Sequence, residues 1–299
     1  MRTRTTIEFQ HLTKHFGPVR AVDDLSFTVE PGRVTGFLGP NGAGKTTSLR
    51  SLLGLVRPTS GTATFGGIAY RDLPRPLATV GTALEASSFS PGRTARNHLL
   101  VAAAAAGIPR SRADEVLELT GIAEAGNRRV GGFSLGMRQR LGLAFALLGD
   151  PEVLVLDEPI NGLDPEGIRW IRGLLRELAQ QGRTVLVSSH LLSEVQQTVD
   201  HVVILSHGRV VHEGSLDDFG SSPAVVVDSP DRPGLRAALL AAGLPVADGD
   251  SGLVVSAPAV DVGAAAARAG IALSLLQPER AGLEETFLQL VGTGEGVGA

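Results

Sequence analysis

One stretch of this chain limits its possible folds more than any other: the glycine-rich run GPNGAGKT at residues 39–46. It fits the pattern G-x-x-x-x-G-K-[ST], which chance should produce at roughly 0.004 per chain of this composition. The apolar run RVTGFLG leads into it, and a segment with helical spacing of apolar residues follows. A loop in this setting surrounds phosphate oxygens with backbone N–H groups and a helix N-terminus. The run therefore predicts a phosphate-binding loop in an α/β fold.

Two side chains of this loop predict its chemistry. Lys45 is long enough to reach the β- and γ-phosphates of a nucleotide, and Thr46 can place its hydroxyl on Mg²⁺. The chain has only two lysines, Lys14 and Lys45, among 27 basic residues, so a lysine at the motif position is informative. A chance glycine-rich turn is the alternative, and the strand and helix on either side argue against it.

The rest of the chain alternates between strands and helices. Alternating or continuous apolar runs predict strands at 6–10, 25–32, 33–39, 62–70, 152–159 and 184–190, and a hairpin over 201–214. Helical spacing predicts helices from 45 to about 54, between about 86 and 149, and at 165–181 and 191–199. A loop is expected over 16–24, and a capping box at Ser111 predicts a helix start. This alternation indicates a mostly parallel sheet.

Two domains are expected, at residues 1–219 and 220–299. The first contains a helical subdomain at about 86–149, and DFGSSP at 218–223 is the expected linker. The second domain is small and of α+β type. It reads strand, helix, strand, strand, helix, strand over 224–276, a ferredoxin-like pattern, and a last helix follows at 283–290.

Two adjacent acids, Asp157 and Glu158, close the apolar run LVLDEP. Burying two carboxylates without a partner is costly, and a magnesium ion with a bound nucleotide would supply that partner. Asp157 would then coordinate Mg²⁺, mostly through water, and Glu158 would act as the base for the attacking water. The alternative is an acidic strand end that faces solvent.

A competing hypothesis concerns Ser134, which sits in GFSLG. This stretch fits the G-x-S-x-G nucleophile elbow of hydrolases, and an Asp (Asp157 or Asp164) and His190 follow in the order of a serine hydrolase. However, the pattern is expected at roughly 0.3 per chain by chance, and no strand leads into the serine as an elbow requires. Ser134 is better suited to the N-cap of the helix that follows it.

Composition excludes several other classes. The chain has no cysteine, which rules out disulfides and cysteine-based metal sites. Its net charge of −4 and pI of about 6.0 argue against a nucleic-acid partner. No apolar run reaches the roughly 18–20 residues of a membrane span, and MRTRTTIEFQ lacks the apolar core of a secretory signal. We therefore expect a cytoplasmic protein whose membrane role, if it has one, comes through a partner.

Six motifs in collinear order over about residues 5–219 resemble the ATP-binding cassette (ABC) family of ATPases. FSLGMRQR stands at the family's signature, VLVLDEP at its Walker B, NGLDP at its D-loop and SSH at its switch loop. The resemblance implies a P-loop NTPase core with a mostly parallel sheet, an antiparallel β subdomain and a helical subdomain. The ATP-binding residues that it implies are Phe16, Gly39, Pro40, Asn41, Gly42, Ala43, Gly44, Lys45, Thr46, Thr47, Ser134, Gly136 and Asp164.

Further implications follow from this resemblance. ATP and Mg²⁺ are the cofactors, Lys45, Glu158 and His190 are catalytic, and Thr46 and Asp157 are on the metal. Two subunits, expected to be identical, close head to tail around two ATP molecules, with the Ser134 helix of one facing the γ-phosphate held by the other. An integral-membrane permease is the other partner, reached through the Q-loop region.

Two positions depart from the family's usual spelling. Glu85 stands where the Q-loop has Gln, so it would lie near the metal, although it can also be a surface loop acid. Leu135 and Met137 replace Gly and Gln in the signature. These spellings resemble the exporter subfamily of the bacitracin and lantibiotic type. Phe16 matches the aromatic residue that stacks on adenine, with a core position as the alternative.

The sequence thus predicts the ATP-hydrolysing subunit of a two-component exporter for a drug, antibiotic or lipid-like cargo. The subunit is expected to be peripheral on the inner face of the cell membrane. Two alternatives remain at this point: an importer subunit, and an ABC ATPase that acts on DNA or ribosomes without transport.

Overall fold

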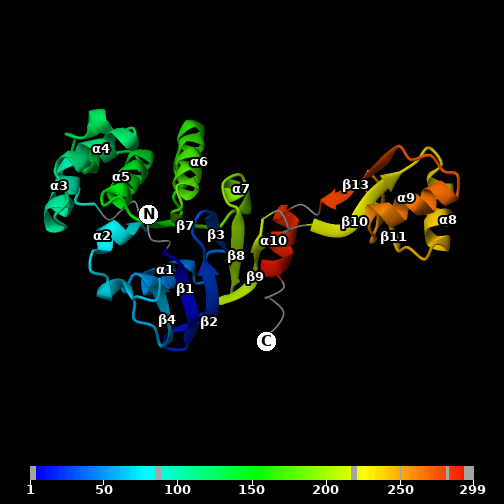
Figure 1. Ribbon diagram of the computed structural model, residues 1–299, viewed down its shortest axis with the longest axis horizontal. Coiled ribbons are helices and arrows are strands. Elements are labelled where there is room, and N and C mark those ends of the chain that lie inside the picture. The colour runs from blue at the N-terminus through cyan, green and yellow to red at the C-terminus, as the bar shows by residue number, and fades with distance from the viewer. Residues whose placement is uncertain (1–4, 85–88, 217–220, 250, 281–282, 293–299) are drawn as a thin grey trace. The chain divides into compact units, whose positions relative to one another are not determined.

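The computed structural model (Figure 1) describes residues 5–84, 89–216, 221–249, 251–280 and 283–292. Its contacts divide it into two compact units. Unit 1 comprises the described residues up to Leu216 and the end of the last helix from Leu290, and unit 2 runs from Asp217 to Gln289. Unit 2 thus begins within three residues of the expected boundary, whereas the expected second domain continues to the end of the chain.

A six-stranded sheet forms the centre of unit 1. Its strands follow the order β5-β6-β7-β3-β8-β9, and all neighbours are parallel except β8 and β9. The strands are β3 (Val34–Leu38), β5 (Val80–Ala83), β6 (Val153–Asp157), β7 (Thr184–Ser189), β8 (His201–Ser206) and β9 (Arg209–Ser215). Every residue of β3, β6 and β7 is buried, as expected for parallel strands covered on both faces.

An antiparallel sheet of three strands packs on this centre. Its order is β2-β1-β4, and the strands are β1 (Ile7–Phe16), β2 (Val19–Val29) and β4 (Ser60–Phe65). The two sheets and helix α1 (Lys45–Leu52) share one hydrophobic core. Phe9, Phe27 and Phe37 stack through it, with ring centroids 4.5 and 5.3 Å apart.

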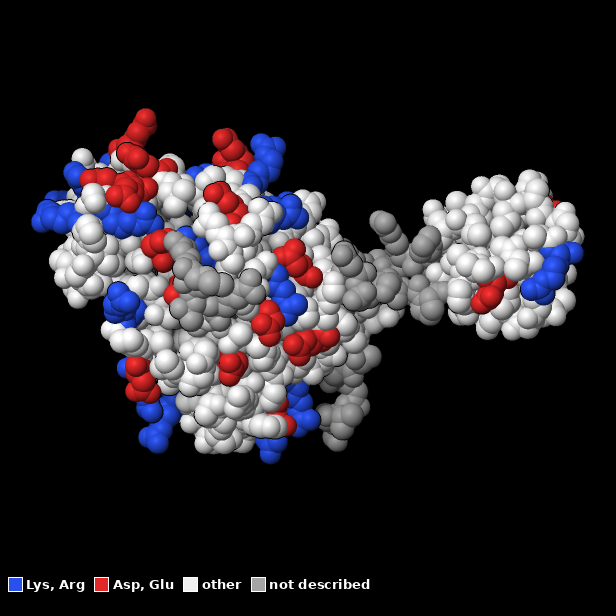
Figure 2. Space-filling view, viewed as in Figure 1, with Lys and Arg blue, Asp and Glu red and all other residues white. Residues whose placement is uncertain are grey.

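Helices complete unit 1. The expected helical segment holds α3 (Ala95–Ala105), α4 (Ser111–Leu119) and α5 (Leu135–Leu147), which contact one another. The remaining helices are α2 (Pro76–Thr79), α6 (Pro165–Gln180) and α7 (Leu192–Val195). Within the described ranges, no helix combines the length and the apolar character needed to cross a membrane. On the face of unit 1 seen in Figure 2, basic and acidic side chains lie interspersed.

Several local expectations were wrong. The expected loop over 16–24 is mostly strand, because β1 pairs with β2 up to Phe16 opposite Val19. The pairing of β1 with β2 shifts register at three places between Phe9 and His15, and these irregularities hide both strands from a period-2 search. Strand β4 ends at Phe65, although a strand to residue 70 was expected. Strand β5 was not expected at all, and α7 is shorter than the helix expected over 191–199.

The expected capping box at Ser111 is also absent. Helix α4 begins at Ser111, but its N-cap is Arg110, which makes no side-chain cap hydrogen bond. The carboxylate that would complete the box, Asp114, instead accepts a hydrogen bond from Arg96 at 2.5 Å. A tertiary ion pair therefore replaces the local contact that the sequence pattern suggested.

Unit 2 is a four-stranded antiparallel sheet with two helices packed against it. The sheet order is β11-β12-β10-β13, and helices α8 and α9 share its core of Val, Leu and Ala side chains. The elements are β10 (Ser221–Asp228), α8 (Arg232–Ala241), β11 (Val246–Gly249), β12 (Gly252–Val255), α9 (Ala259–Arg268), β13 (Leu275–Arg280) and α10 (Leu283–Gly292), whose end belongs to unit 1. Their succession is strand, helix, strand, strand, helix, strand, followed by the last helix.

Candidate functional site

The phosphate-binding loop connects β3 to α1, and glycine is required at several of its positions. Gly39, Gly42 and Gly44 have φ angles of 155°, 84° and 106°, which side chains other than glycine rarely adopt. Space is also lacking. A Cβ at Gly39 would lie 2.4 Å from the carbonyl oxygen of Leu205, and one at Gly44 would lie 2.3 Å from that of Ala21. The glycines thus let the loop lie directly against neighbouring backbone.

The loop curves around a cavity of about 250 Å³, which we call the phosphate cavity. Ala21 of β2 and Glu158 contribute to its wall. The remaining lining residues all come from the loop and the first turn of α1: Pro40, Asn41, Gly42, Ala43, Gly44, Lys45, Thr46 and Thr47. The structure therefore brings the motif residues and one of the two predicted acids to a single concave surface.

Lys45 places its ammonium group inside this loop. The residue is only 6% exposed, and its Nζ donates to the carbonyl oxygens of Gly39 at 2.5 Å and Pro40 at 3.2 Å. Burial lowers the pKa of Lys45, while the nearby carboxylates of Glu158 and Asp157 raise it. The ammonium group is thus a poorly solvated cation, and an anion on the loop would stabilise it.

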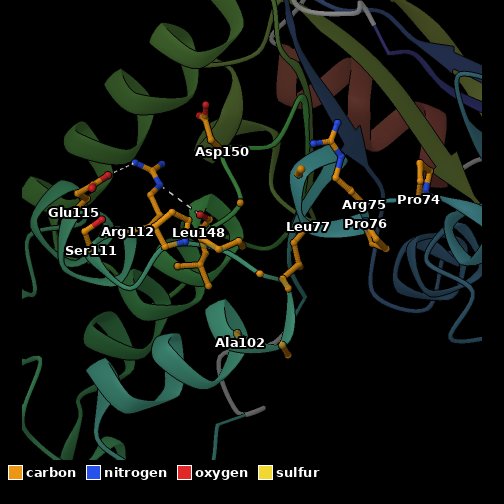
Figure 3. Close-up of a pocket in the computed structure, with 17 residues that line it drawn as sticks. Pro74, Arg75, Pro76, Leu77, Ala102, Ser111, Arg112, Glu115, Leu148 and Asp150 are labelled. Atoms are coloured by element: carbon orange, nitrogen blue, oxygen red, sulfur yellow. Dashed lines mark hydrogen bonds and ion pairs between the residues drawn. The ribbon is translucent and has the colours of Figure 1, made fainter.

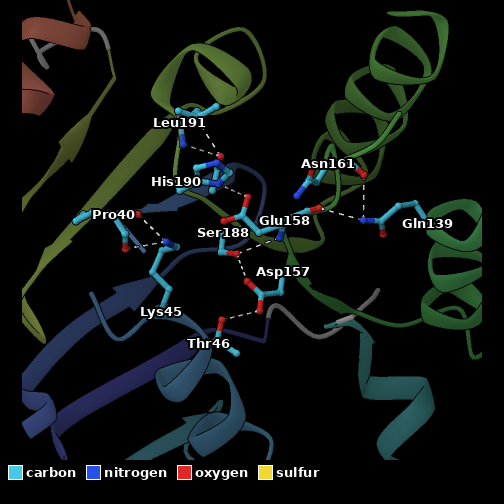
Figure 4. A network of polar contacts seen from close by, with 12 residues as sticks. Pro40, Lys45, Thr46, Gln139, Asp157, Glu158, Asn161, Ser188, His190 and Leu191 are labelled. Atoms are coloured by element: carbon cyan, nitrogen blue, oxygen red, sulfur yellow. Dashed lines mark hydrogen bonds and ion pairs between the residues drawn. The ribbon is translucent and has the colours of Figure 1, made fainter. Parts of the chain in front are cut away.

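Asp157 ends β6 with both carboxylate oxygens bound (Figure 4). Thr46 Oγ1 donates to Oδ2 at 2.9 Å, and the buried Ser188 hydroxyl of β7 donates to Oδ1. Asp157 itself is 8% exposed. A hydroxyl and a carboxylate are thus held in contact at the edge of the phosphate cavity.

Glu158 follows with a backbone φ of 50°, an uncommon conformation for a non-glycine residue. Its N–H donates to the carbonyl oxygen of Ser188 at 3.3 Å and the hydroxyl at 3.1 Å. Its carboxylate Oε2 lies 3.0 Å from His190 Nδ1. Burial raises the pKa of Glu158, and the His190 hydrogen bond and the charge of Lys45 oppose that rise. A carboxyl group with a raised pKa in a cavity is suited to accepting a proton.

Phe16 lies at the end of β1 and is 50% exposed, which contradicts the alternative of a core position. The ammonium group of Lys14 sits 4.8 Å from its ring centroid. The same Lys14 is held by a 2.8 Å hydrogen bond to the carbonyl of Arg57. Phe16 therefore has a cation over its ring and is open to solvent over about half of its surface.

The other predicted ATP-binding residues sit at two helix starts. Ser134 caps α5 by accepting a hydrogen bond from the Met137 N–H at 3.2 Å, as predicted. Asp164 caps α6 in the same way, by accepting from Gly167 at 2.8 Å. Neither they nor Gly136 belong to the described lining of the phosphate cavity of their own chain.

The hydrolase hypothesis for Ser134 does not survive. The residues before it form a 3₁₀ turn over Val130–Gly132, not the strand that a nucleophile elbow needs. The hydroxyl of Ser134 is used as a helix cap.

Sequence reasoning missed two side chains of the polar network. Ser188 was noted only as part of a motif, although a serine at the end of a buried strand beside an acid could have indicated it. Gln139 donates to two backbone carbonyls beside the site (Figure 4). It stands within the stretch FSLGMRQR that was matched to the signature, but no role was predicted for it. Glu85, predicted to lie near the metal, falls outside the described residues.

A larger groove of about 850 Å³ lies elsewhere in unit 1 (Figure 3). It runs between α2, the end of α3, the start of α4 and the residues that follow α5. Alanine, proline and leucine side chains form most of its wall. Arg112 donates to the carbonyls of Leu147 and Leu148 and pairs with Glu115 at 3.0 Å. The mostly apolar wall distinguishes this groove from the phosphate cavity, despite its greater volume.

Comparisons with known proteins agree with the motifs. Residues 22–161 match the family described as ABC transporter, and residues 223–284 match a domain of unknown function (DUF8746). The bacitracin transport ATP-binding protein BcrA of Bacillus licheniformis is 47% identical over 216 residues, which is 71% of each chain. The lantibiotic transport ATP-binding protein SrtF of Streptococcus pyogenes is 35% identical over 71% of this chain and 91% of its own.

A solved structure supports the same assignment. The ATP-binding subunit of an ABC transporter superposes with a TM-score of 0.65 and 28% identity, over 73% of this chain and 92% of that one. The resemblance and the fold class predicted from the motifs are thereby confirmed. The chain belongs to the ATP-binding subunits of ABC transporters, and its activity is ATP hydrolysis coupled to transport.

Proposed function

We propose that this subunit drives export of an antibiotic-like, drug-like or lipid-like cargo through a separate membrane permease. Support comes from the relatives, which are named for bacitracin and lantibiotic transport, and from Leu135 and Met137, which resemble the signature spelling of that subfamily. The subunit would be peripheral, bound to the cytoplasmic face of the membrane through the permease. An importer is the alternative, and the direction of transport distinguishes the two.

The site supports a specific division of labour. Lys45 and the loop N–H groups would hold the β- and γ-phosphates, because a buried ammonium and a helix N-terminus both favour an anion. Phe16 would stack on adenine. Glu158 would accept the proton of the attacking water, and His190 would fix the orientation of the Glu158 carboxylate. The Glu158–His190 contact next to Lys45 is the observation that carries this assignment.

The residues present also fit Mg²⁺. The Thr46 hydroxyl and the Asp157 carboxylate are hard oxygen ligands in mutual contact, and Mg²⁺ takes few protein ligands and fills its remaining positions with water and phosphate. In the part of the chain that the structure describes, no group of three or more His, Cys, Asp or Glu side chains is placed to hold a metal ion, so the fit rests on the Thr46–Asp157 pair alone. When bound, the ion would neutralise charge on the phosphates.

The location of Ser134 supports a dimer. Ser134, Gly136 and Asp164 lie outside the phosphate cavity of their own chain, so they would act on nucleotide held by a second subunit. The N-terminus of α5 carries partial positive charge suited to a γ-phosphate. We propose a homodimer that closes head to tail on ATP and reopens after hydrolysis.

Glu158→Gln tests the catalytic assignment. The amide keeps the shape of the side chain but cannot accept a proton, so turnover should fall by about 10²–10⁴-fold. ATP binding should persist, and the dimer should accumulate in the presence of ATP, as measured by size-exclusion chromatography. Glu166→Gln, an exposed acid in the first turn of α6, is the matched control. Normal hydrolysis by Glu158→Gln would show that the base lies elsewhere.

A transport assay tests cargo and direction. The subunit and a co-expressed permease of about six spans would be placed in inside-out membrane vesicles with labelled bacitracin. ATP-dependent accumulation inside the vesicles is expected for an exporter. Release of preloaded bacitracin on addition of ATP would favour the importer instead.

A further inference from the structure

The first two turns of α5 contact the segment between β6 and α6, residues 158–164, which we call the acidic loop. Gln139 makes the polar part of this contact. Its Nε2 donates to the carbonyl oxygens of Glu158 at 3.3 Å and Asn161 at 3.2 Å (Figure 4). A carboxamide nitrogen carries two hydrogens, so both bonds form at once.

The carbonyl that Gln139 holds belongs to a residue in an uncommon conformation. Glu158 has a φ of 50°, and a non-glycine residue keeps such a backbone only when its surroundings fix it. Ser188 of β7 accepts from the Glu158 N–H. Gln139 of α5 fixes the other side of the residue by donating to its carbonyl. The backbone that orients the Glu158 carboxylate is therefore attached to both β7 and α5.

An apolar contact lies one helical turn before Gln139. Leu135 covers Gly162 of the acidic loop so closely that a Cβ on Gly162 would lie 2.3 Å from Leu135 Cδ2 and 2.6 Å from Cγ. Gly162 also has a φ of 76°. A side chain at 162 would therefore have to push aside that of Leu135, which is 52% exposed, besides being strained at this φ. Leu135, which departs from the usual spelling of the signature, fits a space that this glycine provides.

We propose that Gln139 and the Leu135–Gly162 pair make α5 and the acidic loop move as one body, so that Gln139 is a positioning residue for ATP hydrolysis. A displacement of α5 would be transmitted to Glu158 of the same subunit. This inference rests on the proposed function, in which α5 meets the nucleotide of the second subunit. Contact of α5 with the nucleotide held by the second subunit would then change the position of Glu158, which acts on the nucleotide held by its own subunit.

The first test compares variants of Gln139 that keep or lose hydrogen-bond donors. Gln139→Met has a similar length and no donor, and kcat should fall by about 10–100-fold, the range expected for a misplaced catalytic group. KM for ATP should change by less than about threefold, because Lys45 and the loop are untouched. Gln139→Lys retains donors and should recover most of kcat. Arg138→Ala, the preceding residue on α5, is the control and should behave like the wild type.

Hydrogen exchange provides a readout that does not depend on turnover. In Gln139→Met, amides of the acidic loop should exchange faster than in the wild type, whereas Arg138→Ala should leave them unchanged. Wild-type exchange in the Met variant, or equal kcat for the Met and Lys variants, would overturn the proposal. If the wild-type protein failed to hydrolyse ATP, the proposed function would fail, and the exchange result would still decide this inference.

The second test is a double-mutant cycle on the apolar pair. Gly162→Ala should lower kcat several-fold, because alanine is strained at a φ of 76° and its Cβ collides with the side chain of Leu135. Adding Leu135→Ala removes the clashing Cδ2 and Cγ atoms, so the double variant should be several-fold more active than Gly162→Ala alone. Recovery should be partial, since alanine at a φ of 76° stays strained. Effects that simply multiply would show that the two residues act independently.

Discussion

Ser188→Ala tests the network around the two acids most directly. The Ser188 hydroxyl is fully buried and joins three elements of the site. It donates to Asp157 Oδ1 and accepts from the Glu158 N–H at 3.1 Å. Alanine leaves both partners in place and removes only the oxygen between them. Asp157 then keeps Thr46 as its partner, and the Glu158 N–H keeps the Ser188 carbonyl at 3.3 Å.

The expected loss can be worked from these contacts. A hydrogen bond to a charged group stabilises the fold by about 1.5–3 kcal/mol. The Glu158 N–H retains an acceptor, so its contribution to the loss is small, and we expect a decrease of about 2–3 kcal/mol in the free energy of unfolding. For a unit of about 200 residues, each kcal/mol lowers Tm by about 2–4 °C. The predicted drop in Tm is therefore about 4–12 °C.

Calorimetry on the nucleotide-free protein measures this effect, and Thr35→Val is the matched control. Thr35 lies on the adjacent strand β3 and is also fully buried, but its hydroxyl has no hydrogen-bond partner among the described residues. Replacing it with an isosteric apolar side chain should leave Tm unchanged or raise it. A Ser188→Ala protein whose Tm stays within about 1 °C of the wild type would refute this assignment of the bond energy.

Two further predictions concern the nucleotide and pH. Phe16→Ala should raise KM for ATP by about 5–160-fold, because base–aromatic stacking contributes about 1–3 kcal/mol. Phe16→Tyr and the exposed Val19→Ala should leave KM unchanged, and steady-state ATPase kinetics measure all three. Glu158 can act as a base only when its carboxylate is ionised. Burial raises the pKa of Glu158 above the ordinary 4.5. ATPase activity should therefore be present above that raised pKa and be lost as the pH falls through it. His190→Ala removes the hydrogen bond and the charge that lower the pKa of Glu158, so the acidic limb of the pH profile of kcat/KM should move to higher pH. An acidic limb at the wild-type pH would argue against Glu158 as the titrating base.

Elements with a single strong determinant could be predicted from the sequence. Strands β3 and β6 are continuous apolar runs, and the loop 39–46 carries its geometry in its glycines. Strand β5 could not be found in this way. Gly81 interrupts its pattern because α5 passes so close that a Cβ there would lie 2.1 Å from the carbonyl of Ala146. The need for glycine at position 81 comes from a helix about sixty residues away in the sequence, so the residues next to Gly81 do not indicate it.

The site divides in the same manner. Lys45, Thr46 and Asp157 could be predicted as site residues because each belongs to a motif with a chemical reason for its residue type. Gln139 acts through backbone carbonyls, and a carbonyl is present at every position, so nothing in the sequence marks its partners. The sequence shows that Leu135 is unusual for the signature. Its contact with Gly162 could not be predicted, because it depends on a distance that only the fold determines.

The backbone packing of the phosphate-binding loop has a thermodynamic consequence. Because Gly39 lies against the carbonyl of Leu205 and Gly44 against that of Ala21, we expect the loop to have few other conformations before nucleotide binds. Binding then loses little conformational entropy, and most of the favourable contact energy remains as affinity. No slow rearrangement of such a preformed loop has to precede binding of the phosphates. The association rate constant for nucleotide should therefore depend on solvent viscosity only through diffusion.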